Sequence, residues 1–238
     1  VEERRHRAAD ALQVLRRPPD AAARRHLTVT ASLPWTTAWI TGASTGIGRE
    51  VALQMAAAGV RVAASSRSAA SLEGLHPNIR PYPLDVTDAA AVAETVARIE
   101  AELGAIDLAV FAAAVYAPVD PARLDLKRFE DALQTNVMGV VNCIAAALPK
   151  MQARGKGHLA WFASVAGYRG LPKAAAYGPS KAALINLAES LKPDLSRMGV
   201  TVSVINPGFV ETPLTSKNDF PMPFLMKPAD AARLTIQG

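Results

Sequence analysis

Tyr177 and Lys181 are a phenol and an amine four residues apart, side chains and a spacing that suit proton transfer, and Ser164 precedes the tyrosine by thirteen residues. Two residues four apart lie on one face of a helix. A nearby ammonium favours the phenolate, so we expect Lys181 to lower the pKa of Tyr177 and to prepare the phenol for acid–base chemistry. Such a pair also arises by chance, and an ordinary surface pair is the alternative.

A second pattern, Thr41-Gly-Ala-Ser-Thr-Gly-Ile-Gly48, follows a short apolar run and precedes a helical one. Glycines at a turn between a strand and a helix let a ligand approach the backbone closely. The N–H groups at the start of the helix attract a pyrophosphate. The pattern therefore indicates a dinucleotide site, with an ordinary turn between strand and helix as the alternative.

These residues depend on elements that bring them together. Short β-branched runs predict strands at 39–41, 60–65, 79–86, 106–113, 158–164 and 200–205. Helical patterns lie at 47–58, 69–75, 89–103, 126–137, 139–153, 179–198 and 229–236. Helices between strands imply crossover connections, so we predict an α/β fold, a doubly wound parallel sheet with helices on both faces. Ser164 would close the fifth strand, where its hydroxyl can meet the phenol at the carboxyl edge of the sheet.

The composition excludes several classes of protein. The 238 residues are 50% hydrophobic and 20% charged, which suits a substantial core and not a disordered chain. A single cysteine, Cys143, excludes a disulfide framework and fits a reducing compartment. The four histidines are too far apart for a zinc motif, and no apolar run of about eighteen residues predicts a membrane span. We therefore expect a cytoplasmic protein without a metal.

The formal net charge of +5 is concentrated at the start of the chain, where residues 1–27 hold seven arginines and four acids. The four acids argue against a mitochondrial transit peptide. Nucleic-acid binding needs a basic patch with aromatic residues on the folded body, and aromatic residues make up only 5% of the chain. We predict a basic extension over residues 1–33 and one domain over residues 34–238, and no nucleic-acid partner.

The motifs together resemble those of the short-chain dehydrogenase/reductase family, from about Trp39 to Gly238. The resemblance is carried by the glycine turn, Ser164-Val-Ala-Gly167, Tyr177-x-x-x-Lys181 and Asn206-Pro-Gly208, which occur in the family's order. It implies a Rossmann-like fold. It also implies that Tyr177 is the general acid/base, that Ser164 holds the substrate oxygen and that Lys181 binds the nicotinamide ribose. Asn136 matches the asparagine that orders a water of the proton relay.

The same resemblance implies cofactor contacts from the glycine turn, from the ends of the next strands and from the segment after the sixth strand. These residues are Gly42, Ser44, Thr45, Gly46, Ile47, Gly48, Ser66, Arg67, Asp85, Val86, Ala113, Tyr177, Lys181, Pro207, Gly208, Val210 and Thr212. Relatives that use NAD carry an acid at the end of the second strand. Here neutral Ser66 and cationic Arg67 stand there, and arginine pairs with phosphate, so NADP is favoured over NAD. Thr45 departs from the basic residue of many NADP-dependent relatives.

Several features depart from the family pattern. Phe111-Ala-Ala-Ala114 stands where Asn-Asn-Ala-Gly is usual, which removes amides that tie the sheet together. Pro193 lies inside a predicted helix and should kink it. A seventh strand is expected beyond Gly238. Residues 213–228 are apolar and rich in proline, and we predict a substrate lid there, with an ordinary surface loop as the alternative.

We therefore predict an oxidoreductase that interconverts a carbonyl and an alcohol by hydride transfer with NADP(H). Its partner would be a small carbonyl or alcohol substrate, and the apolar lid favours a hydrophobic one. A non-catalytic NADP-binding sensor or scaffold is the alternative. Family members commonly pair through the helices that correspond to 139–153 and 179–198, so the resemblance also implies a homodimer or homotetramer.

Overall fold

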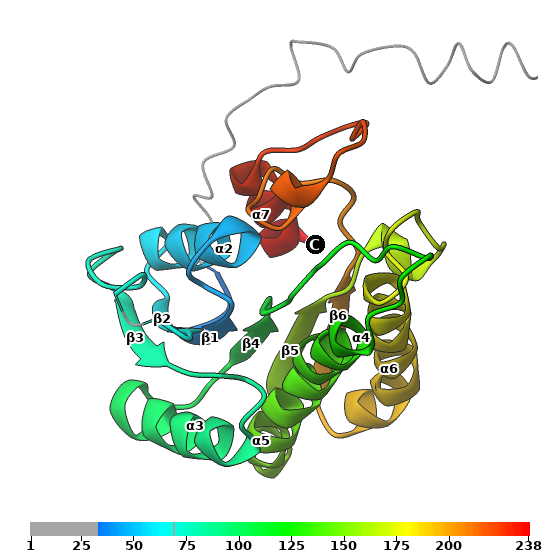
Figure 1. Ribbon diagram of the computed structural model, residues 1–238. Coiled ribbons are helices and arrows are strands. Elements are labelled where there is room, and N and C mark those ends of the chain that lie inside the picture. Colours follow the sequence, from blue (N-terminus) through cyan, green and yellow to red (C-terminus); the bar gives the residue numbers. More distant parts are fainter. Residues whose placement is uncertain (1–32, 69) are drawn as a thin grey trace, which may run out of the picture. The chain divides into compact units, whose positions relative to one another are not determined.

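The computed structural model describes residues 33–68 and 70–238, and the predicted extension falls outside this part except for Leu33. Six parallel strands form one sheet in the order β3-β2-β1-β4-β5-β6 (Figure 1). Their bounds are β1 Thr37–Thr41, β2 Arg61–Ser66, β3 Ile79–Pro83, β4 Leu108–Phe111, β5 Gly157–Phe162 and β6 Val200–Ile205. The order reverses between β1 and β4, so the carboxyl ends of these two strands open a crevice where ligands bind in doubly wound folds.

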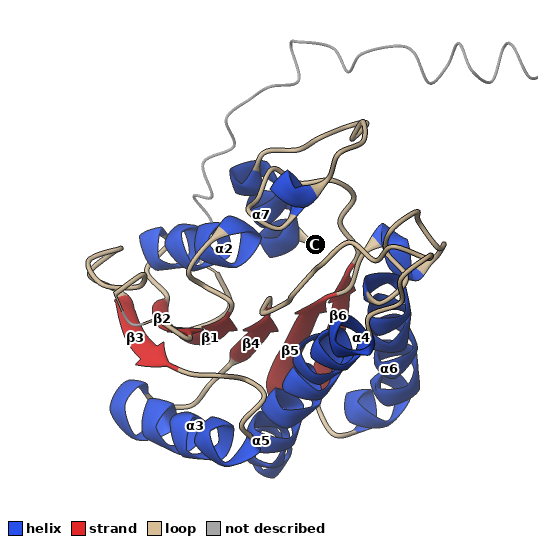
Figure 2. Cartoon of the chain, viewed as in Figure 1, coloured by secondary structure: helices blue, strands red, loops and turns tan. Residues whose placement is uncertain are grey.

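Helices cover both faces of the sheet, as the sequence predicted (Figure 2). One face carries α2 (Gly46–Ala57) and α7 (Pro228–Gln237), which pack against each other. The other carries α3 (Ala89–Leu103), α5 (Gly139–Arg154) and α6 (Tyr177–Arg197). Each face has its own apolar core, so the doubly wound prediction is confirmed.

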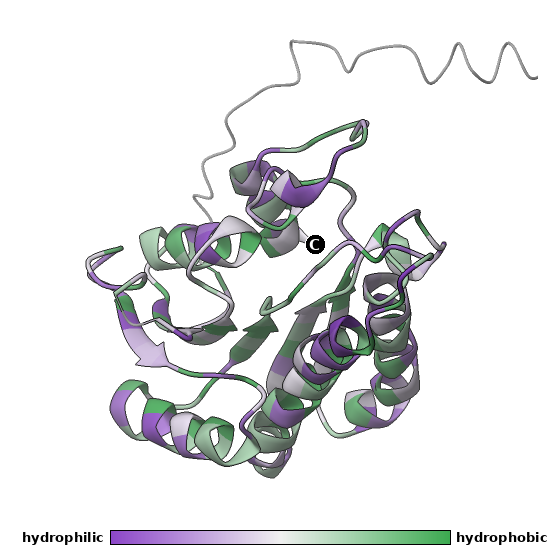
Figure 3. Ribbon diagram, viewed as in Figure 1, coloured by the Kyte–Doolittle hydropathy of each residue, from purple (hydrophilic) through white to green (hydrophobic). Residues whose placement is uncertain are grey.

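The strands are apolar because both of their faces are covered. All residues of β1 and β4 are buried, and so are the last five of β2. Figure 3 shows this apolar centre, with hydrophilic residues on the outer sides of the helices. The burial fixes where each strand ends, and therefore where the residues of its carboxyl edge stand.

The helix Leu126–Arg154 runs continuously through α4 (Leu126–Ala132), a π-helical turn (Leu133–Met138) and α5. Among the described residues it is the one helix that is long and apolar enough to cross a membrane by length and composition. Its buried residues, which include Val140, Cys143 and Met151, pack in the core against the sheet. It is therefore a core helix of this domain.

The structure corrects some predicted boundaries. Residues 70–74 form turns and not the helix predicted at 69–75. β3 ends at Pro83 and β5 at Phe162, so Asp85, Val86 and Ser164 follow their strands instead of closing them. α6 begins at Tyr177, two residues before the predicted start, and includes Pro193 in a helix that runs to Arg197, as the predicted helix did. The two helices predicted at 126–137 and 139–153, which adjoin in the sequence, form one continuous helix.

Candidate active site

The glycine turn lies between β1 and α2, as predicted. Gly42 and Gly46 have φ values of 68° and 58°, a region that favours glycine. A Cβ on Gly42 would stand 2.5 Å from the backbone nitrogen of Ala113, and one on Gly48 would stand 2.5 Å from the carbonyl oxygen of Gly42. Gly42 therefore has no room for a side chain because the backbone after β4 is too close, and Gly48 has none because it packs against Gly42. Thr45 caps α2 in an extended conformation without a side-chain hydrogen bond to the helix.

The structure brings Tyr177, Lys181 and Ser164 together at the carboxyl edge of β5. Tyr177 and Lys181 occupy the first two turns of α6, and the Lys181 Nζ lies 5.4 Å from the centre of the Tyr177 ring. Lys181 is only 2% exposed, and its Nζ donates a hydrogen bond of 2.7 Å to the Phe162 carbonyl at the end of β5. Ser164 is buried, and its Oγ accepts a hydrogen bond from the Ala166 amide.

Burial controls the protonation of this group. It raises the pKa of Tyr177 to about 12, and the polar interaction with the Ser164 side chain acts in the opposite direction. It lowers the pKa of Lys181 to about 7. The expectation that Lys181 would lower the pKa of Tyr177 is therefore wrong for this structure. Desolvation of the phenolate outweighs the neighbouring amine, whose own charge is disfavoured by the same apolar surroundings.

Asn136 is fully buried in the π-helical turn and acts on the backbone around it. Its Oδ1 accepts from the Val115 amide at 2.8 Å, and its Nδ2 donates to the Val115 carbonyl and the Ser180 hydroxyl, both at 3.0 Å. Ser180 in turn donates to the Tyr177 carbonyl at 2.7 Å. Asn136 therefore joins the segment after β4 to the first turn of α6. A π-helical turn is a frequent mark of a functional site.

Ser66 and Arg67 stand at the end of β2, beside Asp85. The Ser66 hydroxyl donates to the Ser68 carbonyl at 2.9 Å. Hydrogen bonds from Thr87 lower the pKa of Asp85, and the charge of Arg67 lowers it further. The residues 65–68 that end β2 carry hydroxyl groups and one guanidinium, so this corner offers a cation and hydrogen-bonding groups to a ligand.

The segment after β3 is fixed from α5, which the sequence did not predict. The Asn142 Nδ2 donates to the Val86 carbonyl at 2.9 Å. A Cβ on Gly139 would stand 2.6 Å from a methyl group of Val86. The start of α5 therefore determines where Asp85 and Val86 lie at the edge of the cleft.

One cleft of about 740 Å³ unites these features. It is lined by all the residues singled out in the sequence for catalysis or cofactor contact, except Asn136, which lies behind its wall. Within the described residues, no group of three histidine, cysteine or acidic side chains could hold a metal ion. The volume lies within the range of about 300–1,000 Å³ that is usual for small-molecule and cofactor sites.

Comparison with known proteins agrees with this geometry. A family model described as short chain dehydrogenase matches residues 36–221. The chain belongs to the short-chain dehydrogenase family. It is therefore an oxidoreductase, and the family binds a nicotinamide cofactor.

Individual relatives and solved structures extend this result. An "uncharacterized oxidoreductase" of Myxococcus xanthus is 43% identical over 215 residues, which cover 87% of this chain and 85% of that protein. The 3-oxoacyl-[acyl-carrier-protein] reductase FabG of Escherichia coli is 34% identical, over 75% of each chain. The solved structure "ElxO with NADP Bound" has a TM-score of 0.77 at 26% identity, over 84% of this chain and 90% of its own.

In this short-chain dehydrogenase the segment Phe111-Ala-Ala-Ala114, which departs from the usual Asn-Asn-Ala-Gly, begins at the end of β4 with an aromatic contact. Phe111 is buried and packs edge-on against Trp39 of β1, with ring centres 5.5 Å apart. The Trp39 Nε1 donates to the Ser65 hydroxyl of β2 at 3.0 Å. Thr41, which pairs with Phe111 in the sheet, has a buried Oγ1 without a hydrogen-bond partner among the described residues. Apolar packing thus joins β1 and β4 here, in place of side-chain amides.

The sequence did not single out Tyr116, which lies in the segment after β4 and lines the cleft. It is 8% exposed, and its ring packs edge-on against the Tyr177 ring with centres 5.3 Å apart. Its carbonyl accepts from the Lys217 Nζ at 3.0 Å. A lone tyrosine after a predicted strand carries no motif, so only the fold could place it beside Tyr177.

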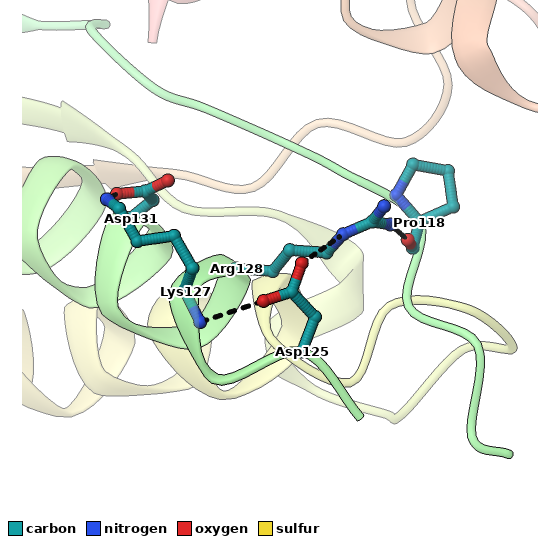
Figure 4. A network of polar contacts seen from close by, with 5 residues as sticks. All are labelled: Pro118, Asp125, Lys127, Arg128 and Asp131. Carbon is teal, nitrogen blue, oxygen red and sulfur yellow. Dashed lines mark hydrogen bonds and ion pairs between the residues drawn. The ribbon is translucent and has the colours of Figure 1, made fainter. Parts of the chain in front are cut away.

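Polar contacts tie the same segment to α4 at the rim of the cleft (Figure 4). Asp125 caps α4 by accepting from the Lys127 amide at 3.0 Å, and it also accepts from the Arg128 Nε at 3.2 Å. Arg128 donates to the Pro118 carbonyl, and Lys127 pairs with Asp131. Arg128 and Asp131 line the cleft, so its rim carries charges of both signs.

Residues 213–228 lie between the site and α7. Two backbone hydrogen bonds of 2.9 Å close their ends, from the Glu211 amide to the Met226 carbonyl and from the Met226 amide to the Phe209 carbonyl. Phe220 packs edge-on against Phe209, with ring centres 6.0 Å apart. Phe224 is 94% exposed at a φ of 58°.

Proposed function

We propose that this enzyme interconverts a carbonyl and an alcohol with NADP(H), and that Tyr177 is its general acid/base. One observation supports the proposal above the others. The Tyr177 phenol, the Ser164 hydroxyl and the Lys181 amine converge at the edge of a cleft whose other end is lined by the glycine turn. This arrangement places a proton donor beside a site that suits a dinucleotide.

The cofactor site fits a dinucleotide on the residues themselves. Gly42 and Gly48 leave no room for side chains and keep the turn close to the end of β4. The N-terminus of α2, whose first turn contains no acid, faces the same cleft. An anion is favoured there by the unpaired N–H groups and the helix dipole. When bound, the reduced nicotinamide supplies the hydride for the carbonyl carbon.

The residues of the chain supply the proton and hold the oxygen. Tyr177 is a neutral phenol at neutral pH, and burial, which raises its pKa to about 12, keeps it so, which leaves a proton to donate to the alkoxide that forms. The Ser164 hydroxyl would hydrogen-bond the same oxygen and stabilise its developing charge. The Lys181 Nζ, which donates a hydrogen bond to the Phe162 carbonyl, lies near the Tyr177 ring. Its protonated form would stabilise the phenolate that remains after Tyr177 has given up its proton. In the oxidative direction the same groups work in reverse.

NADP is proposed over NAD on the charge at the end of β2. Arg67 and Ser66 line the cleft there, and a guanidinium pairs with a phosphate through two hydrogen bonds. The NADP bound to ElxO, a structural neighbour, agrees with this choice. Replacing Arg67 by alanine should raise the KM for NADPH while changing the KM for NADH little. An equal rise for both cofactors would mean that Arg67 does not read the 2′-phosphate.

The proposed substrate is a small carbonyl compound with an apolar portion. The enzyme is proposed to act in the cytoplasm, as a homodimer or homotetramer. The apolar side chains of residues 213–228 beside the cleft support a lid over such a substrate. The relative named 3-oxoacyl-[acyl-carrier-protein] reductase indicates that 3-oxo thioesters are the first compounds to try.

The decisive experiment compares the purified protein with Tyr177→Phe. The nucleotide that co-purifies is identified first, and NADPH oxidation is then followed with a panel of ketones and 3-oxo thioesters. We expect Tyr177→Phe to lower kcat by about 10²–10⁴-fold while NADPH binds as before, because only the proton is lost. Unchanged turnover, or a wild-type protein that binds NADPH and reduces nothing, would favour the sensor or scaffold instead.

A further inference from the structure

A second, smaller chamber adjoins the reaction centre on the side of residues 213–228. Its volume is about 70 Å³, against about 740 Å³ for the cleft. The residues that line both spaces are Tyr116, Ser164, Tyr177, Gly208, Leu214 and Thr215. Both hydroxyls of the proposed catalytic group therefore stand at the border between a large space and a small one.

Most of the wall of this chamber is apolar, although Asn218, whose Oδ1 is buried without a hydrogen-bond partner among the described residues, also lines it. The apolar part comes from the turn after β5, the loop before α6, and the segment after β6, through Val165, Leu171, Pro172, Ala174, Phe209 and Phe220. Transfer of a methyl or methylene group from water into such a space is favourable, whereas an unpartnered polar group is penalised. An apolar substituent is therefore the group that this chamber accepts.

Its size limits that substituent. Its volume of about 70 Å³ is small beside that of the cleft, about 740 Å³. A short alkyl group therefore matches this space better than a pentyl chain does. A carbonyl oxygen held between Ser164 and Tyr177 would then direct its smaller substituent into the chamber and its larger one into the cleft.

Tyr116 forms the wall between the two spaces and is fixed from three directions. Its ring packs against the Tyr177 ring. Asn136 holds the preceding residue, Val115, by both its amide and its carbonyl. Lys217 donates to the Tyr116 carbonyl from the segment that follows β6. A wall fixed in this way cannot yield cheaply to a longer chain.

Side chains of residues 213–228 line another part of the chamber. Phe220 packs against Phe209, and Asp219 beside it pairs with Lys173 of the loop before α6 at 2.5 Å. These contacts hold Phe220 over the chamber. Two aromatic side chains, Tyr116 and Phe220, thus bound the chamber on different sides.

We propose that the chamber is the subsite for the smaller substituent of the carbonyl substrate, and that Tyr116 and Phe220 restrict it to a methyl or ethyl group. The substrate class is accordingly a ketone with one short alkyl arm and one longer arm. This inference rests on the proposed carbonyl reduction and adds the shape of the substrate to it.

The test uses 3-oxoacyl thioesters of N-acetylcysteamine, in which the thioester arm is constant and the alkyl group on the ketone grows from methyl through ethyl and propyl to pentyl. The readout is kcat/KM with NADPH for each chain length. We expect the wild-type enzyme to lose at least about tenfold between ethyl and pentyl, since a pocket discriminates by about that factor or more for each misfit methylene.

Two variants enlarge the chamber and one serves as the control. Tyr116→Ala and Phe220→Ala remove different walls, and each should raise the ratio of pentyl to methyl kcat/KM by about tenfold over the wild type. Tyr116→Phe retains the ring and should keep the chain-length dependence of the wild type. A cooperative thermal transition shows that a variant is folded, and Phe220→Ala carries the test if Tyr116→Ala fails to fold.

The outcomes separate the two proposals. A wild-type enzyme that reduces every thioester without regard to chain length overturns the subsite and leaves the carbonyl reduction intact. An equal loss at all chain lengths in both enlarged variants also overturns it, because the walls would then only support Tyr177. A wild-type enzyme that reduces none of the panel overturns the proposed function itself.

Discussion

Replacing Lys181 by methionine is expected to stabilise the folded protein at neutral pH while abolishing carbonyl reduction. The Lys181 side chain is 2% exposed, and burial lowers its pKa to about 7 from the ordinary 10.5. The unfolded chain therefore binds more protons than the folded one between these two pH values. Stability must then rise with pH across that window, because the folded state favours the neutral amine.

The magnitude follows from the same two pKa values. One pH unit corresponds to about 1.4 kcal/mol, so the buried lysine reduces the free energy of unfolding by about 4 kcal/mol at pH 7 and by about 1 kcal/mol near pH 10. Methionine removes this penalty but leaves the Phe162 carbonyl without its donor, which costs about 2 kcal/mol. The net gain is about 2 kcal/mol at pH 7, a rise in Tm of about 4–8 °C for a domain of this size. Near pH 10 the difference should change sign.

Thermal unfolding of both proteins without nucleotide, followed by circular dichroism near pH 7 and near pH 10, measures this difference. Lys192→Met is the matched control, because Lys192 lies on the exposed side of the same helix. Its Tm should track that of the wild type at both pH values. Two results would refute the account of Lys181 as a buried base: a Lys181→Met protein that is less stable than the wild type at pH 7, or a difference in Tm between the two proteins that is the same at both pH values.

Three further substitutions probe the scaffold of the site. Gly42→Ala should lower the free energy of unfolding by about 3 kcal/mol or more in chemical denaturation, because the added Cβ would stand 2.5 Å from backbone. Gly59→Ala is the control: its φ is 90° but the space around it is open, so the loss of stability should be only about 1–2 kcal/mol. Asn136→Ala should lower kcat and destabilise the protein by about 1–3 kcal/mol, since the Val115 amide loses its acceptor; unchanged kcat would remove Asn136 from the site. Glu100→Gln should destabilise the protein at neutral pH by about 1–2 kcal/mol, because desolvation is outweighed by hydrogen bonds from Arg154, the Ile106 amide and Lys150, which lower the pKa of Glu100. The difference from the wild type should vanish as acid protonates Glu100, and a difference in stability that persists in acid would contradict this.

The sequence predicted the sheet and the positions of the motifs because both depend on local patterns. Strands that are buried on both faces appear as short apolar runs, and the helices between them leave only parallel pairing. The glycine turn could be placed because its glycines are demanded by φ and by the close approach of the β4 end. Tyr177 and Lys181 share a helix, so their proximity needed no tertiary information.

Properties that depend on the surroundings of a residue could not be predicted in the same way. The pKa of Tyr177 was expected to fall because of Lys181, whereas burial raises it, and burial is created by Tyr116 and by elements distant in sequence. The helix predicted at 69–75 contains good helix formers such as Ala70 and Leu72, yet these residues form turns. The contact that Phe111 makes could not be predicted either, because it depends on the position of the Trp39 ring on the neighbouring strand.

Residues 213–228 are held by two kinds of contact that differ in their response to salt. At the two ends of this segment, backbone hydrogen bonds join Met226 to Phe209 and Glu211, and added salt leaves these bonds unchanged. Two ammonium groups hold its middle part: Lys173 pairs with Asp219, both with substantially exposed side chains, and Lys217 donates to the Tyr116 carbonyl. Counterions screen such surface charges over about 10 Å at 0.1 M salt. Rising ionic strength should therefore weaken the contacts of Lys217 and Asp219, while the backbone hydrogen bonds at residues 209–211 and 226 persist. If product release limits kcat, kcat should then increase with salt concentration.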